Sequence, residues 1–164
     1  MESKSLFSPF TVLRSCKIIL FWDNFLRMSE NNTFIKLTWE QFDQAVISLA
    51  NQLRGRNFSS IYGEPRGGLP LAVALSHRLK IPLKLEPSPD CLWCDDIIDS
   101  GYTYSQTITR YPKVTYCVWV TKKEHINALF ALNLSKHSEW ILFPWEIQEF
   151  IQQEQLAYQR RIQS

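Results

Sequence analysis

The sequence contains no apolar run long enough to cross a membrane. Its most apolar early stretch, residues 18–22, is followed at once by Asp23, whereas a membrane-spanning helix needs about 20 apolar residues. The same stretch lacks the longer apolar centre and the small-residue cleavage site of a secretory signal peptide. We therefore predict no transmembrane segment and no secretory signal.

An excess of charge of one sign is also missing. The formal net charge is +2, and the basic residues are dispersed rather than gathered in a stripe. Such a balance gives no reason to expect nucleic acid or an anionic membrane as a partner. We expect no nucleic-acid partner.

Cysteine and histidine are few. Four cysteines in a chain without a secretory signal argue against a disulfide scaffold and favour a reducing compartment, the cytoplasm. Cys91 and Cys94 form a single CxxC pair on a predicted buried strand, so a zinc or redox site is the less favoured alternative. His77, His125 and His137 have no metal-ligand spacing, and we expect them on the surface of helices or loops.

The length of the chain fits one domain. It has 164 residues, which is within the usual domain size. Recognisable patterning begins just after Met28, which resembles a start of its own. We expect residues 1–27 to be a dispensable leader, or not part of the natural protein, and residues 28–164 to form the folded domain. A chain that begins at Met28 is then expected to unfold at the same temperature as the full chain.

A β-α-β order follows this leader. Residues 34–37 are a short strand candidate, and Thr38 with Gln41 three positions later is a capping box that opens a helix. Apolar residues at three- and four-residue spacing continue that helix to about Arg54. Residues 59–63 are consistent with the first core strand, so the pattern indicates an α/β fold.

The rest of the chain alternates in the same way. Short apolar runs leave one segment, residues 125–134, open between helix and strand. A short apolar stripe on the last predicted helix is typical of a face that seals a core or a dimer interface. The expected elements are a helix at 71–79, a strand at 81–85, a proline-serine loop at 86–90, a helix at 104–110, a strand at 114–120 and a final helix at 146–162.

The most informative stretch is residues 91–103, Cys-Leu-Trp-Cys-Asp-Asp-Ile-Ile-Asp-Ser-Gly-Tyr-Thr. Its apolar beginning predicts a buried strand, which Asp95 and Asp96 follow. Residues 100–103 offer hydroxyls and permissive backbone where a helix would begin, and a helix N-terminus is a natural anion site. Because the carboxylates would repel a bare phosphate, they indicate sugar hydroxyls or a divalent cation beside it. The combination describes a phosphorylated sugar.

A second candidate for phosphate binding is the turn at residues 64–70. Its paired glycines, Gly67 and Gly68, allow backbone N–H groups to approach a ligand closely. Arg66 offers a fork of donors to phosphate oxygens. Taken alone, the Arg-Gly-Gly sequence of residues 66–68 is more typical of an ordinary tight turn.

Residues 92–103 resemble the phosphoribosyl-pyrophosphate motif of the type I phosphoribosyltransferases: apolar residues, Asp-Asp, two apolar residues, then Asp-Ser-Gly-x-Thr. The family also has an Arg-Gly-Gly turn after its first core strand, which residues 66–68 match. Residues 64–65, Glu-Pro, depart from the small polar residue that relatives carry there. The resemblance implies an open, mainly parallel α/β sheet flanked by helices, with a small hood and ligand at the carboxyl ends of the strands.

Further stretches are similar to the bacterial xanthine-guanine phosphoribosyltransferases, namely residues 28–30, 37–39, 111–113, 121–123 and 140–146. This resemblance implies that Lys122 meets the exocyclic oxygen of a 6-oxopurine. The alternative for Lys122 is a solvated charge. The base is left open among guanine, xanthine and hypoxanthine, because Leu142 stands where relatives place an acidic residue.

The resemblance further implies roles for a set of residues. Asp99 would act as general acid or base at the purine, and the expected product is a nucleoside monophosphate in purine salvage. We also expect Asp95 and Asp99 to lie in a solvent-accessible loop. The resemblance assigns the ribose hydroxyls and Mg²⁺ to Asp95 and Asp96. It assigns the 5-phosphate to Ser100, Gly101, Tyr102 and Thr103, and pyrophosphate to Arg66, Gly67 and Gly68. Trp140 would stack on the base, or is otherwise a core or interface aromatic, and the Ile141 backbone would contact the two-position edge of the base.

Two alternatives stay open beside this enzyme. Residues 86–90 are too short and too proline-rich to form the flexible segment with which relatives cover phosphoribosyl pyrophosphate. Slow turnover with retained binding is therefore expected, unless a neighbouring subunit of a homodimer or homotetramer supplies the cover. A catalytically weak, nucleotide-binding regulator and a transferase for another base are the alternative functions.

Overall fold

The computed structural model describes the backbone of residues 34–163 and the side chains of residues 34–160. The expected leader, residues 1–27, lies outside the described residues. The described chain divides into two units, of which the small one consists of residues 34–35 and Glu139–Ile141. The larger unit, residues 36–138 and 142–163, carries the main sheet.

The main sheet is entirely parallel and has four strands in sequence order. Its central strands are rich in β-branched and aromatic residues and are buried along most of their length, as parallel strands covered on both faces are. Cys94 lies opposite Cys117 in this register. The strands are β2 (Ile61–Gly63), β3 (Leu92–Ile98), β4 (Thr115–Thr121) and β5 (Leu129–Asn133).

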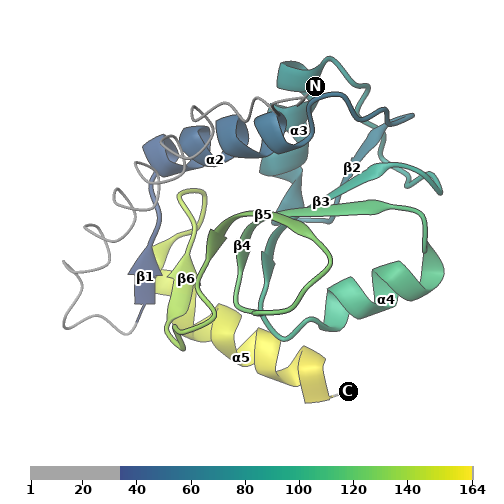
Figure 1. Ribbon diagram of the computed structural model, residues 1–164. Helices are drawn as coiled ribbons and strands as arrows, with labels where there is room; N and C mark the ends of the chain where they lie inside the picture. Colours follow the sequence, from purple (N-terminus) through teal and green to yellow (C-terminus); the bar gives the residue numbers. More distant parts are fainter. Residues whose placement is uncertain (1–33, 164) are drawn as a thin grey trace, which may run out of the picture. The chain divides into compact units, whose positions relative to one another are not determined.

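Helices cover both faces of this sheet (Figure 1). Helix α2 (Trp39–Gln52) begins with the predicted capping box between Thr38 and Gln41 and packs on β4 and β5. Helix α3 (Gly68–Leu79) packs beside it on β2 and β3. Helix α4 (Tyr102–Arg110) connects β3 to β4 on the opposite face. The prediction of an open, mainly parallel α/β sheet is therefore confirmed.

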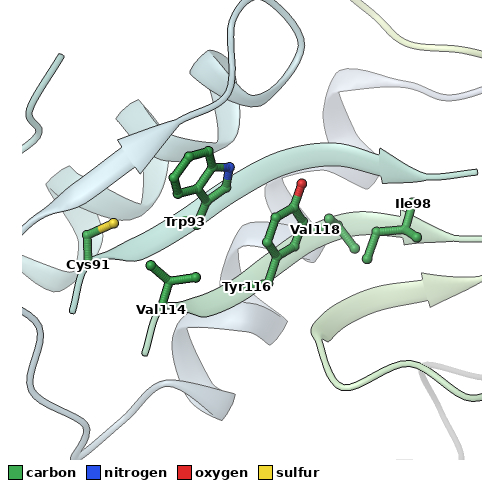
Figure 2. Close-up of a cluster of buried hydrophobic side chains, with 6 residues drawn as sticks. All are labelled: Cys91, Trp93, Ile98, Val114, Tyr116 and Val118. Atoms are coloured by element: carbon green, nitrogen blue, oxygen red, sulfur yellow. The ribbon is translucent and has the colours of Figure 1, made fainter. Parts of the chain in front are cut away.

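The core on the α4 face is a cluster of side chains from the central strands (Figure 2). Trp93 of β3 stacks near Tyr116 of β4, with ring centroids 6.4 Å apart. Tyr104 and Ile108 of α4 pack against this cluster. The helix that follows the predicted sugar-phosphate motif is thus fixed to the sheet by apolar burial, which holds the loop before it in place. The buried members are Cys91, Trp93, Ile98, Val114, Tyr116 and Val118.

Several boundaries differ from the sequence prediction. The segment left open between helix and strand contains β5. The strand predicted at residues 81–85 is wrong: only a single bridge joins Leu83 to Ile61. Pro82 has no backbone N–H to donate to a neighbouring strand, and the Leu85 side chain is exposed. Extending the bridge into a strand would therefore add little hydrogen bonding and little apolar burial.

The last predicted helix is divided into a 3₁₀ turn, η1 (Gln148–Phe150), and α5 (Ile151–Gln163). A separate two-stranded sheet pairs β1 (Phe34–Lys36) with β6 (Trp140–Leu142). The small hood over the site stays a prediction. Among the described helices, none combines the length and the apolar character that a membrane span requires.

Candidate functional site

Three segments that follow parallel strands meet at one edge of the main sheet. Strands β2, β3 and β4 end at Gly63, Ile98 and Thr121. Because the strands are parallel, their carboxyl ends share an edge, which is where open α/β sheets bind ligands. The Lys122 backbone N–H donates to the carbonyl of Ile98 at 2.8 Å, which ties the segment after β4 to the end of β3.

The turn after β2 is held against β3 by its backbone. The Glu64 N–H donates to the Cys94 carbonyl at 2.9 Å, and the Gly68 N–H donates to the Glu64 carbonyl at 2.8 Å. A Cβ at Gly67 would overlap the Asp96 carboxylate, and one at Gly68 would overlap the β3 backbone. The turn therefore needs glycine to approach the strand this closely. The peptide between Pro65 and Arg66 is cis.

Asp95 and Asp96 have different surroundings. Asp95 lies within β3 and is only 7% exposed, so its expected place in a solvent-accessible loop is wrong. The Tyr116 hydroxyl donates to Asp95 Oδ2 at 2.8 Å. Burial, and next the charge of Asp96, raises the pKa of Asp95 well above its usual value. Asp96 is partly exposed and lies against Gly67.

The loop after β3 is shaped by one glycine and one ion pair. Gly101 has a φ of 86°, a left-handed conformation that glycine adopts without steric cost, and α4 begins at the next residue. The Tyr102 N–H points to Ser100 Oγ at 3.3 Å. Asp99 lies in this loop, partly exposed as expected, and its Oδ1 is 3.4 Å from Lys122 Nζ. Two predicted site residues from neighbouring strands are thus brought together.

Two residues that the sequence interpretation missed reach the site from α5. Glu154 Oε1 is 3.1 Å from Arg66 Nη2, and the Tyr158 hydroxyl accepts the Ser100 N–H at 3.1 Å. Burial raises the pKa of Tyr158; the hydrogen bond with Ser100 lowers it, and the charge of Asp99 raises it. The two residues are four positions apart and so share one helix face, which is the sequence signal that could have drawn attention to them.

Glu146 is a third residue of this region for which no role was predicted. Its Oε2 accepts the Phe143 N–H at 2.9 Å. Burial raises the Glu146 pKa; the charges of Asp96 and Glu154 raise it further, whereas Arg66 lowers it. These effects place Glu146 within electrostatic reach of the Arg66 turn.

Two predicted base-binding residues belong to the small unit. Trp140 and Ile141 lie on β6, and Ile141 is buried. Their expected roles at the base stay predictions.

The cysteines of the main sheet are buried free thiols. Cys91 and Cys94 are fully buried, and burial raises the pKa of both. A buried, protonated thiol is a poor nucleophile and a poor metal ligand. In the described part of the chain no group of three or more histidine, cysteine or acidic side chains is arranged to hold a metal ion by itself.

Solved structures with the same fold include enzymes of nucleotide metabolism. The purine phosphoribosyltransferase of Pyrococcus horikoshii Ot3 matches with a TM-score of 0.62 and 28% identity, over 71% of this chain and 96% of that chain. The xanthine-guanine-hypoxanthine phosphoribosyltransferase of Helicobacter pylori matches with a TM-score of 0.57 and 20% identity, over 76% and 99%. A hypothetical protein from Neisseria gonorrhoeae with bound ppGpp matches with a TM-score of 0.59 and 19% identity, over 76% and 96%.

The last two structures share too little sequence with this chain to show more than the fold. No protein-family model matches the chain, and no curated protein matches its sequence significantly. The Pyrococcus structure adds sequence similarity to the shared fold. Residues 92–103 form the strand, loop and helix start that the motif predicts, and the Arg-Gly-Gly turn packs against them. The chain therefore has the type I phosphoribosyltransferase fold and resembles enzymes of that family at its motif residues.

Proposed function

We propose that the protein transfers the 5-phosphoribosyl group of phosphoribosyl pyrophosphate to N9 of a 6-oxopurine, which is guanine, xanthine or hypoxanthine. The observation that carries this proposal is the meeting of three segments at one sheet edge: the turn after β2, the loop after β3, and Lys122 after β4. They offer contacts for a diphosphate, a sugar phosphate and a base, in that order. Similarity to a purine phosphoribosyltransferase supports the substrate class.

The two phosphate positions follow from the available donors. The Arg66 side chain is 87% exposed, so its guanidinium is accessible to the diphosphate, and residues 67–68 add backbone N–H groups. The 5-phosphate is assigned to residues 100–103. The first N–H groups of α4 have no partner within the helix there, and the Ser100 and Thr103 residues are exposed.

The ribose and Mg²⁺ are assigned to Asp96 rather than to both aspartates. Mg²⁺ binds one or two ionised carboxylates together with water and substrate phosphates. Asp96, beside the assigned diphosphate position, fits this role, whereas the burial and raised pKa of Asp95 favour its neutral form. When bound, the ion would offset the charge of the departing pyrophosphate. Asp95 accepts the Asp96 N–H at 2.9 Å and so holds the neighbouring residue in place.

Asp99 is proposed as the proton acceptor. During transfer the bond from C1′ to the pyrophosphate oxygen breaks, the bond from C1′ to N9 forms, and the N9 proton passes to the Asp99 carboxylate. The 3.4 Å separation of Lys122 Nζ and Asp99 Oδ1 supports a shared ligand, since Lys122 is proposed to donate to the exocyclic oxygen of the same base. Trp140 is proposed to stack on the base. The Ile141 backbone is proposed to form hydrogen bonds with the two-position edge of the base.

An activity panel tests this function. The full chain is incubated with phosphoribosyl pyrophosphate, Mg²⁺ and individual purine and pyrimidine bases, and nucleotide is detected by chromatography. We expect nucleoside monophosphate with 6-oxopurines and none with Asp99→Asn over the same period. Asp43→Asn, a matched change at an exposed position of α2, should behave as the unsubstituted protein. Product with orotate or uracil alone, or with no base, would contradict the assignment.

A nucleotide-binding regulator of the same fold is the second candidate. The connection from α3 to β3 contains no helix or strand, and residues 86–90 are stiffened by Pro87 and Pro89. A cover for the site is therefore absent from this connection, which is where relatives carry one. The Neisseria protein with bound ppGpp has the same fold. Calorimetric binding of phosphoribosyl pyrophosphate without turnover on any base would favour this candidate.

A further inference from the structure

Helix α5 lies on the site without being built into the core. From residue 151 to residue 160 none of its side chains is buried. The apolar side chain of Leu156 is 54% exposed. A segment that buries so little apolar surface has a low free energy of local opening. Its polar contacts therefore account for much of its attachment.

Those contacts fall on the two segments that are assigned to phosphates. Glu154 pairs with Arg66 of the diphosphate turn at 3.1 Å. Tyr158 accepts the N–H of Ser100, the first residue of the 5-phosphate loop, at 3.1 Å. The Glu154 carboxylate and the Tyr158 hydroxyl oxygen thus occupy the Arg66 guanidinium and the Ser100 N–H in the way that phosphate oxygens would.

Tyr158 also lies near the proposed catalytic pair. Burial raises the pKa of the Tyr158 hydroxyl, and so does the charge of Asp99, the residue that is ion-paired with Lys122. While α5 is docked, the proposed proton acceptor therefore has both the helix and the lysine as neighbours. Docking of α5 occupies donors for both phosphates beside Asp99.

We infer that α5 is an intramolecular competitor for the phosphate ligand, and that ligand binding displaces it. The identity of the ligand as phosphoribosyl pyrophosphate rests on the proposed function; the competition itself rests on the contacts of Glu154 and Tyr158. The ligand's phosphate oxygens take the Arg66 guanidinium and the Ser100 N–H, and the helix moves away from both. The free chain thus carries its own cover, although the connection from α3 to β3 is too short to provide one.

Affinity measurements on the full chain test this competition. Glu154→Gln and Tyr158→Phe each remove one contact of α5 and leave Arg66 and Ser100 intact. Because exposed ion pairs and single hydrogen bonds contribute modestly, we expect roughly 2–5-fold tighter binding of phosphoribosyl pyrophosphate for each variant, and roughly 5–20-fold for the double variant. Glu149→Gln removes the same charge from η1, where no ion pair is formed with Arg66, and should leave affinity unchanged. Unchanged or weaker binding in the double variant would overturn the inference.

Hydrogen exchange supplies a second readout. Saturating phosphoribosyl pyrophosphate should speed amide exchange in residues 151–160, whereas a helix that merely packs on the protein should be unaffected or protected. Inorganic pyrophosphate separates the two proposals. If phosphoribosyl pyrophosphate does not bind but pyrophosphate binds the double variant more tightly, the proposed function fails and the competition stands. If phosphoribosyl pyrophosphate is turned over while α5 exchange and variant affinities stay unchanged, only the competition fails; no binding of either ligand overturns both.

Discussion

The two phosphate-binding candidates of this protein are built in opposite ways. The turn after β2 is fixed by backbone hydrogen bonds and by glycines that lie against β3, and its charged residue, Arg66, extends into solvent. The loop after β3 is fixed by side chains: Lys122 pairs with Asp99, and Tyr158 binds Ser100. Substitutions in the first segment should therefore change its shape, whereas substitutions in the second should change its chemistry while the fold is retained.

The largest effect is expected in the loop after β3. Asp99→Asn keeps the size of the side chain but removes the proposed proton acceptor, so turnover should fall roughly 10²–10⁴-fold. Thermal unfolding should change far less than turnover, because Asp99 is partly exposed and asparagine keeps a side-chain oxygen beside Lys122. Steady-state assays beside circular dichroism melts check both statements. Near-normal turnover would remove Asp99 from the proposed mechanism.

The turn after β2 should respond to added volume instead. Gly67→Ala places a methyl group on the Asp96 carboxylate, and such overpacking costs typically about 1–3 kcal/mol of unfolding free energy. Phosphoribosyl-pyrophosphate affinity should fall with it, since the turn must move. Urea denaturation of Gly67→Ala and of Gly67→Ala/Asp96→Ala provides the check: the second variant restores space and should recover much of the lost stability. Equal stabilities of all three proteins would show that the close approach is unimportant.

The buried carboxyl of Asp95 should make the free energy of unfolding depend on pH. Because burial raises the Asp95 pKa, the folded protein retains a proton that the unfolded chain releases above pH about 4. The free energy of unfolding therefore falls as pH rises from about 4 to the raised pKa of Asp95. Asp95→Asn cannot titrate, so its unfolding free energy should depend less on pH in that window. Urea denaturation at a series of pH values measures the difference; parallel curves for the two proteins would contradict the assigned burial of a neutral Asp95.

The smallest effect is expected from Arg66→Lys. Lysine keeps the charge but loses the planar fork that binds two phosphate oxygens at once. Since Arg66 is 87% exposed, affinity for phosphoribosyl pyrophosphate should weaken only about 3–10-fold, the effect of losing part of a charge-assisted hydrogen-bond pair. Stability should be unchanged because the turn is held by its backbone. Calorimetry and a thermal melt test this, and a loss of more than a hundredfold would show a more buried role for this side chain.

The local parts of the site could be predicted from the sequence because their signals are local. The Thr38–Gln41 capping box and the strand-loop-helix pattern of residues 92–103 each depend on neighbours a few positions apart, and the structure has both. The Arg-Gly-Gly turn was predicted at its observed place after β2 for the same reason. Its contact with Asp96 follows once the parallel order of β2 and β3 is known.

The remaining features depend on contacts between distant residues. Buried Asp95 accepts a hydrogen bond from Tyr116, 21 positions away on the next strand, and the spacing of residues around Asp95 does not predict this contact. The docking of α5 depends on the pairing of Arg66 with Glu154, 88 positions apart. Periodicity predicts a helix over residues 146–162 but not which surface it contacts.

The central claim is phosphoribosyl transfer at the sheet edge, and phosphorus NMR observes it directly. The full chain is mixed with phosphoribosyl pyrophosphate, Mg²⁺ and guanine, and each phosphorus species is followed with time. Our account predicts that the substrate signals give way to free pyrophosphate and a nucleoside monophosphate in equal amounts, and that neither forms when guanine is omitted. Pyrophosphate release without nucleotide, or unchanged substrate signals at a protein concentration that binds the ligand, would contradict it.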